Sequence, residues 1–251
     1  MKTILRYLGT SGFALYRQGE RDQTETAKDG QTSKELVIID SYERRPLADI
    51  AHFANVLVLA SHAHFDHFSL EVLEWRHENP AICYILSSDI ARRFNRKIPN
   101  DANVQFISPG DAFKIGELEI RAFGSTDAGC SFGLIWPDIK VFHAGDFNLW
   151  DWKKESTPEE VREAESQFET ILSDIARGMP RPDLALFPVD PRMEIDYYRG
   201  AVRFAQTLRP KLLVPMHFGK VFDPPPGFWE EMNPWTTAVA LQPNAQLLAS
   251  P

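Results

Sequence analysis

Four candidate metal ligands occur within six consecutive residues of this sequence, directly after an apolar run. Residues 62–67 read His-Ala-His-Phe-Asp-His and hold three of the seven histidines in the chain. The preceding run, Asn55 to Ala60, is short, apolar and partly β-branched, which predicts a buried strand. A histidine-rich surface loop is the alternative, but four polar donors next to an apolar strand are costly to desolvate without a cation. The motif therefore predicts a site for Zn²⁺, Fe or Mn²⁺ on the loop that follows this strand.

Length and composition limit the classes of protein that this chain can be. With 251 residues, 43% of them hydrophobic and 25% charged, we expect a single globular domain over residues 1–251. The formal net charge of −8 argues against a partner with a phosphate backbone, although a small anionic substrate held by a metal ion is compatible with it. Cys83 and Cys130 lack metal-binding spacing, and we expect two buried thiols, with one disulfide as the alternative.

The N-terminal residues and the apolar runs predict where the protein resides. Arg6 occurs before any apolar segment of signal-peptide length develops, so we expect no signal peptide. No apolar run approaches the roughly 20 residues that a membrane helix needs. We therefore expect a cytoplasmic protein with no membrane partner.

Hydrophobic periodicity and turn residues predict an antiparallel opening followed by alternating helices and strands. Residues 3–16 are expected to form two strands around the turn at 9–12, and residues 18–34 an exposed hairpin loop. Thr157 and Glu160 form a capping box with Pro158 between them, which predicts the start of the longest helix, ending near Gly178. The tail from Asp223 is expected to wrap the surface. The other predicted strands are 36–40, 81–86, 104–107, 112–115, 118–123, 131–136, 140–143, 184–187 and 212–215, and the other helices are 69–77, 87–96 and 197–208.

Three later strands are also followed directly by polar residues. Asp146 follows the strand at 140–143, Asp190 follows 184–187 and His217 follows 212–215. Polar groups at the ends of several strands can converge on one point at the edge of a sheet. We therefore expect these side chains to lie near the histidine motif.

Together these motifs resemble the metallo-β-lactamase superfamily of metal-dependent hydrolases. The resemblance rests on His62-x-His64-x-Asp66-His67, then Gly-Asp146 after a strand, then Pro-Met-His217 near the C-terminus. The order of strands and helices is similar to that family's four-layer αβ/βα sandwich, an α/β fold of two mixed β-sheets flanked by helices, over nearly the whole chain. The contexts of Asp146 and His217 are similar to the lactonase and phosphodiesterase-like branches.

The resemblance implies one or two bound divalent ions, with zinc the first candidate and manganese, iron or nickel the alternatives. It makes His62 and His64 ligands of a first metal, makes Asp66, His67 and His217 ligands of a second, and places Asp146 between both. Family members have a further histidine before the bridging aspartate, where this chain has none. Asp127 is the candidate replacement, and an Asx-turn residue in a glycine-rich loop is the alternative. A first site without this ligand would be completed by water or would stay empty.

Several other residues are candidates for supporting roles. Asp66, His67 and Asp146 are the expected catalytic residues, with Asp66 orienting the attacking hydroxide. His143 is expected to be a core or supporting histidine, and Asp190 either orients a ligand or caps the turn before Pro191. The expected substrate-binding residues are aromatic, with a role in the core as the alternative, and they are Phe65, Trp150, Trp152 and Phe218.

The expected reaction is hydrolysis of an ester, lactone or phosphodiester of a small molecule by hydroxide formed on the metal. A serine nucleophile in a G-x-S-x-G turn is absent from the sequence. One alternative is a metal- or ligand-binding protein of the same fold without turnover. A nucleic-acid-processing hydrolase is another, which the net charge of −8 disfavours. An iron-dependent oxygen-using relative is a further alternative, and the sequence leaves a homo-oligomer open.

Overall fold

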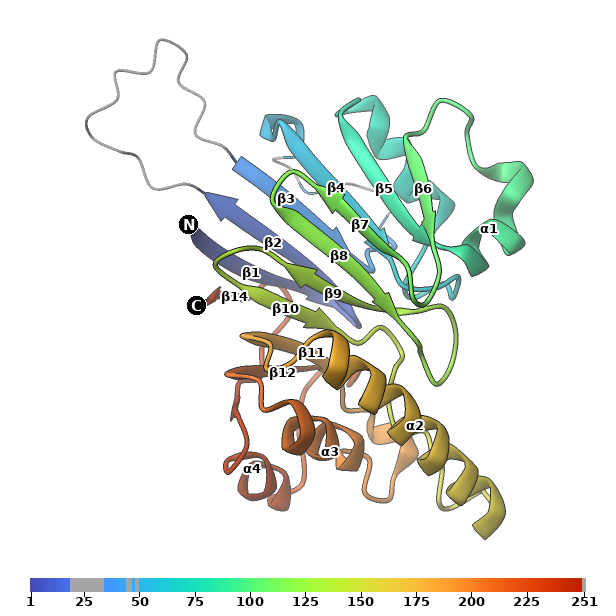
Figure 1. The fold of residues 1–251 in the computed structure, drawn as a ribbon, viewed down its shortest axis with the longest axis vertical. Coiled ribbons are helices and arrows are strands. Elements are labelled where there is room, and N and C mark those ends of the chain that lie inside the picture. Colours follow the sequence, from blue (N-terminus) through green and yellow to red (C-terminus); the bar gives the residue numbers. More distant parts are fainter. Residues whose placement is uncertain (19–33, 44–46, 48–49, 250–251) are drawn as a thin grey trace.

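The protein folds into two mixed β-sheets that pack face to face and carry helices on their outer faces (Figure 1). This computed structural model describes residues 1–18, 34–43, 47 and 50–249. In that part of the chain each sheet has seven strands. The predicted fold class, an α/β sandwich, is confirmed. The loop expected at 18–34 lies, apart from its two end residues, outside the described residues.

The first sheet has the order β14-β1-β2-β3-β4-β5-β6. Its strands from β14 to β3 pair antiparallel, and those from β3 to β6 pair parallel. The carboxyl ends of β3 and β4 therefore lie at the same edge of the sheet. The strands are β1 Lys2–Gly9, β2 Gly12–Gln18, β3 Lys34–Ile39, β4 Asn55–Ala60, β5 Ile82–Ser87, β6 Val104–Ile107 and β14 Gln246–Ala249.

The second sheet repeats this arrangement with the order β13-β12-β11-β10-β9-β8-β7. Its strands from β7 to β10 pair antiparallel, and those from β10 to β13 pair parallel. The carboxyl ends of β10, β11 and β12 share one edge for the same reason. The strands are β7 Ala112–Ile115, β8 Leu118–Phe123, β9 Ser131–Ile135, β10 Lys140–His143, β11 Leu184–Pro188, β12 Leu212–Met216 and β13 Thr237–Ala238.

Alternation of side chains along the strands produces the layers of this sandwich. In β3, Val37 and Ile39 pack into the core between the sheets, whereas Leu36 and Ile38 pack under the outer helices. Helix α1 contacts β5 and β6, while α2, α3 and α4 contact strands of the second sheet (Figure 1). The α-helices are α1 Ser88–Phe94, α2 Pro158–Gly178, α3 Arg199–Leu208 and α4 Gly227–Met232, and the 3₁₀ helices are η1 Ile50–His52, η2 Leu70–His77, η3 Asn95–Lys97 and η4 Pro191–Met193.

Local signals predicted the helix starts well. The capping box of α2 is present, with the Glu160 amide donating to Thr157 Oγ1 and the Thr157 amide donating to the Glu160 carboxylate. Ser69 caps η2, although this element is a 3₁₀ helix. The helix expected to run to Arg96 ends at Phe94, because the chain tightens there into η3. None of the helices in the described ranges combines the length and the apolar composition needed to cross a membrane.

The expectation that the tail from Asp223 wraps the surface is wrong for two of its segments. Strand β13 pairs with β12 in the second sheet, and β14 pairs with β1 in the first, with Ala249 opposite Thr3. Figure 1 accordingly shows β1 and β14 side by side. Pairing between segments so far apart in the sequence leaves no local signal, because short strands of four residues or fewer have little periodicity.

Candidate metal centre

Loops of both sheets bring the predicted donors together at one edge of the sandwich, three of them after strands with parallel neighbours. The histidine motif follows β4, Asp146 follows β10, His217 follows β12, and Asp127 lies between β8 and β9. Their donor atoms form two groups, within each of which the atoms lie within 4.8 Å of one another. We call His62, His64, Asp127 and Asp146 the open group, and Asp66, His67 and His217 the buried group.

Two glycines allow the loops from the second sheet to approach the histidine motif. Gly129 and Gly145 have φ of +64° and +55°, a conformation that side chains rarely adopt. A Cβ on Gly129 would lie 1.9 Å from the carbonyl oxygen of Ser61, and one on Gly145 would lie 2.8 Å from the Ser61 side chain. The backbone amide of Cys130 donates to the same carbonyl oxygen at 3.0 Å. Glycine at both positions therefore makes the close contact between the two halves of the site.

The buried group surrounds a point between the two sheets. Asp66 Oδ2 lies 3.9 Å from His67 Nε2 and 3.7 Å from His217 Nε2. His67 is fully buried, and the His217 side chain is 7% exposed. Both Nε2 atoms are buried without a hydrogen bond in the described structure. Buried nitrogens that face a carboxylate and make no hydrogen bond are the arrangement that a metal ion would complete.

A carboxylate holds the opposite ring nitrogen of each buried histidine. His67 Nδ1 lies 2.8 Å from Asp40 Oδ2, and His217 Nδ1 lies 3.0 Å from Asp190 Oδ2. Asp40 is itself fixed by the amide and hydroxyl of Ser61, both at 2.7 Å. Carboxylates in this position orient a histidine and fix the tautomer whose free Nε2 can bind a metal. Asp190 also accepts from the Arg192 amide, so it both orients His217 and caps η4.

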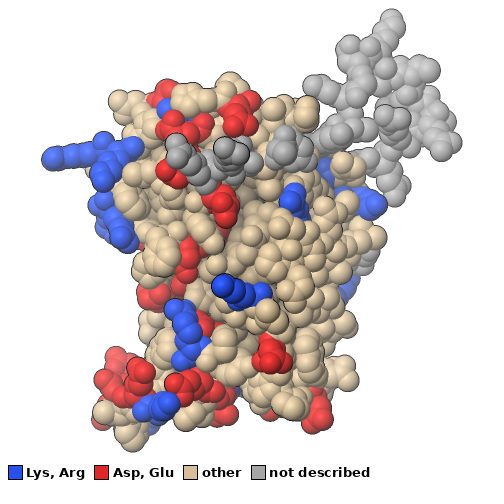
Figure 2. All heavy atoms as spheres, turned by 180° about the vertical axis from the view of Figure 1, so that it is seen from behind, with Lys and Arg blue, Asp and Glu red and all other residues tan. Residues whose placement is uncertain are grey.

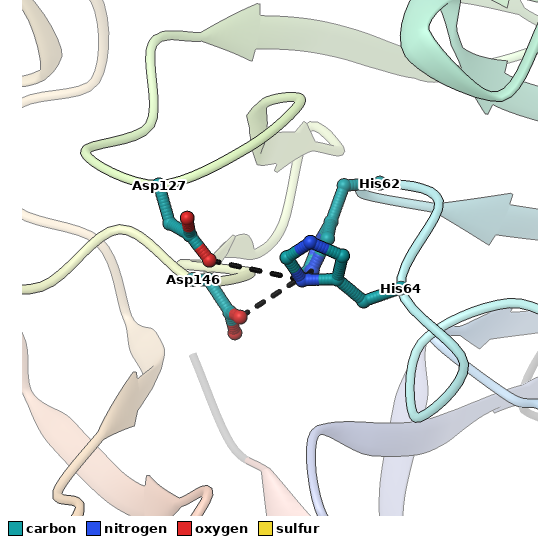
Figure 3. A group of neighbouring side chains, drawn as sticks. All are labelled: His62, His64, Asp127 and Asp146. Carbon is teal, nitrogen blue, oxygen red and sulfur yellow. Dashed lines mark hydrogen bonds and ion pairs between the residues drawn. The ribbon is translucent and has the colours of Figure 1, made fainter. Parts of the chain in front are cut away.

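The open group lies toward solvent. His62 Nε2 lies 2.9 Å from His64 Nδ1, and Asp127 Oδ2 lies 3.7 Å from the same His64 atom (Figure 3). The side chains of His64 and Asp127 are 44% and 47% exposed. Asp127 extends from its loop toward His64 rather than back to the amide of Cys130, which bonds Ser61. Its carboxylate thus lies among the candidate ligands of the open group.

Asp146 faces both groups at once. Its Oδ2 lies 3.3 Å from His62 Nε2, while its Oδ1 lies 3.1 Å from His67 Nε2 and 3.6 Å from His217 Nε2. Oδ1 is buried and makes no hydrogen bond to any described residue. Each side of the centre thus has two imidazoles, one carboxylate of its own and one shared carboxylate. This donor set fits two divalent ions, which these residues would hold with Asp146 between the two groups.

The charges around the centre perturb the pKa values of its residues. Burial lowers the pKa of His67, but Asp40 and Asp146 outweigh burial and raise it to about 10. Burial likewise opposes the raised pKa of His217, which Asp190 and Asp66 bring to about 9. Burial raises the pKa of Asp146, yet the nearby imidazoles of His62 and His67 hold it well below the usual value. The metal-free site therefore holds protons on His67 and His217 that a cation would displace.

A cleft of about 530 Å³ opens over these donors. The rings of Trp150 and Trp152 stack in it with centroids 6.0 Å apart, and Phe65 is 85% exposed at its edge. Phe218 lies elsewhere: its ring is buried in the core against Tyr7 and Phe222, so we leave it out of the candidate substrate-binding residues. The cleft is lined by His64, Phe65, Asp66, Arg93, Thr126, Asp127, Asp146, Trp150, Trp152, Arg192 and His217.

The sequence interpretation missed Asp40 and the two arginines of the cleft. Asp40 ends the apolar run of β3 just as Asp146 and Asp190 follow their strands, so the same signal was present there. Arg93 lies in the helix predicted at 87–96, and no local pattern indicates that Arg93 or Arg192 reaches the cleft. His143 lies in the core, where its Nε2 contacts the Ser11 carbonyl oxygen at 2.8 Å, as expected of a histidine that is not a ligand.

Fold and donor set together define a metal-binding protein of the αβ/βα sandwich class. The family model described as Beta-lactamase superfamily domain matches residues 40–218. A metal-dependent hydrolase of Staphylothermus marinus is 24% identical over 225 residues, which cover 86% of this chain and 83% of that protein. The chain therefore belongs to the metallo-β-lactamase superfamily of metal-dependent hydrolases, as its motifs predict.

Solved structures show the same fold at low sequence identity. Igni18, a metallo hydrolase from the archaeon Ignicoccus hospitalis, matches with a TM-score of 0.68 and 19% identity, over 99% of this chain and 98% of that chain. CmlA, a diiron β-hydroxylase from Streptomyces venezuelae, matches with a TM-score of 0.60 and 14% identity, over 98% of this chain and 54% of that one. A hydrolase and a hydroxylase share this fold, so the reaction must be argued from the site itself.

Proposed function

We propose that this metal-dependent hydrolase cleaves an ester, lactone or phosphodiester bond of a small molecule at a centre of two divalent ions. The observation that carries the proposal is the position of Asp146, one oxygen of which faces each donor group. The buried atoms without hydrogen bonds on His67, His217 and Asp146 support a cation at this point. Zinc is the first candidate, and the imidazole and carboxylate donors are also compatible with manganese, iron and nickel.

The protein's own residues would position the reactants. Divalent ions held here would polarise the scissile carbonyl or phosphoryl group and lower the pKa of a coordinated water. Asp66 lines the cleft, and its side chain is only 27% exposed, so its carboxylate can accept a hydrogen bond from the attacking water and orient it. Trp150 donates from Nε1 to the main-chain oxygen of Asp146 at 2.7 Å, which fixes the loop that carries the bridging residue.

A small molecule fits this cleft better than a nucleic acid does. The cleft has a volume of about 530 Å³, which is in the range of small-molecule sites. On the face shown in Figure 2, the Lys and Arg side chains of the described residues lie in separate groups among Asp and Glu. Binding a phosphate backbone requires a continuous basic surface. The net charge of −8 supports the same choice.

The test combines metal analysis with a substrate panel. Protein purified without chelator should contain up to two equivalents of transition metal by elemental analysis. It should hydrolyse at least one member of a panel of generic esters, lactones and phosphodiesters. Turnover should stop with EDTA and return with zinc or manganese. Absence of metal would refute the site, and bound metal without turnover of any panel member would favour a binding protein instead.

A further inference from the structure

We propose that the substrate is an anionic phosphodiester that carries a planar aromatic group. Arg93 and Arg192 bind its negative charge, and Trp150 and Trp152 hold its ring. This inference rests on the proposed hydrolytic function and names the substrate class of the same cleft. In the reaction, the oxygen of water bonds to phosphorus and one P–O ester bond breaks. The departing oxygen takes up a proton, which leaves a phosphomonoester and an alcohol or phenol.

Arg192 is a cation fixed beside the buried group. Its Nε and Nη2 donate to the Asp190 carboxylate, the same group that holds His217. Nη2 lies 3.5 Å from His217 Nδ1, so the guanidinium is held next to a candidate metal ligand of the buried group. The side chain is nevertheless 67% exposed and lines the cleft, and its Nη1 makes no hydrogen bond to any described residue. A guanidinium edge with free N–H groups matches a phosphate or carboxylate.

Arg93 is a second cation, beside the open group. It lies on α1 and donates from Nη1 to the carbonyl oxygen of Ala63, the residue between His62 and His64. This contact keeps its guanidinium at the cleft. Within the described ranges no carboxylate pairs with it, in contrast to Arg192. An arginine at a cleft without an acidic partner is available to bind an anion.

The charge in the loaded cleft favours an anion over a neutral ester. Five carboxylates surround the centre, Asp66, Asp127 and Asp146 in the donor groups and Asp40 and Asp190 behind the histidines, so the charge of two divalent ions would be neutralised without the arginines. Arg192 balances Asp190, and Arg93, which pairs with no carboxylate of the described residues, gives the cleft wall a net positive charge. The chain as a whole has a net charge of −8, which repels anions, so a local positive field is needed to attract one. A neutral lactone or ester would leave the Arg93 guanidinium without an anionic partner and the outer N–H groups of Arg192 without an acceptor.

The tryptophan pair is a stacked apolar part of the cleft lining next to the donors. The two rings are nearly parallel, at 15°, and Trp150 also meets the edge of His217 at 6.0 Å. Trp152 has φ of +37°, a conformation that is uncommon for a bulky residue and indicates a constrained loop. Asp151 between them is buried and bonds Arg199 at 3.2 Å, which anchors this conformation. Stacked indoles held in this way are suited to contact a planar ring of the substrate.

The proposal is tested by binding, which does not depend on turnover. The probes are monomethyl phenylphosphonate, a stable monoanion, and dimethyl phenylphosphonate, its neutral counterpart, titrated into metal-loaded protein by calorimetry and tryptophan fluorescence. We expect the anion to bind at least about tenfold more tightly. Arg93→Gln and Arg192→Gln should each weaken anion binding about tenfold and leave the neutral compound unaffected, with metal content measured for each. Trp152→Leu should remove the advantage of the phenyl compound over monomethyl methylphosphonate.

Arg92→Gln is the matched control. Arg92 lies on the same helix as Arg93 and bonds Ser88, and it does not line the cleft. Its variant should bind the anion as the unchanged protein does. Equal affinity for the charged and neutral probes, or unchanged anion binding in both Arg93→Gln and Arg192→Gln, would overturn the proposal.

Turnover measurements distinguish a failure of the proposed substrate class from a failure of the proposed hydrolytic function. We expect bis(4-nitrophenyl) phosphate to be hydrolysed with a higher kcat/KM than 4-nitrophenyl acetate, and Arg192→Gln to raise KM for the phosphodiester only. A preference for the neutral ester would overturn the substrate class while upholding the hydrolase. Anion binding through both arginines without turnover of either compound would uphold the recognition site and overturn the hydrolytic function.

Discussion

The two donor groups that share Asp146 differ in burial and in support. In the buried group, His67 and His217 are each held by a carboxylate, at 2.8 and 3.0 Å. In the open group, His64 and Asp127 are 44% and 47% exposed. Supporting carboxylates typically account for about 10–100-fold in metal affinity. The difference indicates that the buried group would hold an ion more tightly than the open group, which lies nearer to solvent.

Removing a ligand from the buried group should have the largest effect. His67→Ala or His217→Ala should abolish both metal binding at this group and hydrolysis, because each loses an imidazole that no neighbouring residue can replace. His52→Ala, an exposed histidine on η1, is the control and should keep full activity. Elemental analysis and turnover of the best panel substrate measure the outcome. Full turnover with intact metal in either ligand variant would show that the buried group is not catalytic.

Removing the supporting carboxylates should have a smaller effect on the same group. Asp40→Asn and Asp190→Asn should each lower the affinity for the ion in the buried group about 10–100-fold. Competition with a fluorescent chelator measures this affinity, and circular dichroism checks that the variants fold. Asp101→Asn changes an exposed carboxylate that pairs with Arg76, far from the ligands in the sequence, and should leave the affinity unchanged. An equal loss of metal affinity at the buried group and the open group would contradict the difference between them.

Changing Asp127 tests the open group alone. If Asp127 replaces the missing histidine, Asp127→Ala should remove one metal equivalent and change the free energy of unfolding of the metal-free protein by at most about 1 kcal/mol. Asp127→His should tighten the open group, because the carboxylate already extends toward His64. Metal titration of the three proteins gives the comparison. Unchanged metal content in Asp127→Ala would mean that water completes this site.

A pH dependence of stability in chelator-treated protein tests the buried group without its metal. The pKa values of His67 and His217, about 10 and about 9 in the fold, lie above the usual 6.5 of an unfolded histidine. Their contribution is fully present below pH 6.5 and is lost as the pH rises through 9 to 10. The free energy of unfolding should therefore fall by an amount on the order of a few kcal/mol over this range. Urea denaturation at several pH values measures it, with metal-loaded protein as the control, whose coordinated histidines carry no such protons. A flat profile after metal removal would contradict the assignment.

The sequence predicted those helices and strands whose signal lies within a few neighbouring residues. The capping box of Thr157 and Glu160 and the strands before Asp146 and His217 were predicted from spacing and apolar runs, because hydrogen bonds and periodicity over a few residues determine them. The resemblance to a known family then supplied the candidate ligands and the sandwich fold. The C-terminal strand β14 could not be predicted in this way, since its partner β1 lies at the other end of the chain.

The sequence by itself determined which residues could bind metal, since the motif at 62–67 and the donors after strands are visible in it. Only the tertiary structure decided that Asp40 supports His67, that Arg93 and Arg192 reach one cleft, and that Phe218 belongs to the core. The physical reason is distance along the chain. Asp40 and His67 are 27 residues apart, and Arg93 and Arg192 come from different halves of the sandwich. Such contacts exist only after two sheets pack and their strand ends converge, which no local spacing encodes.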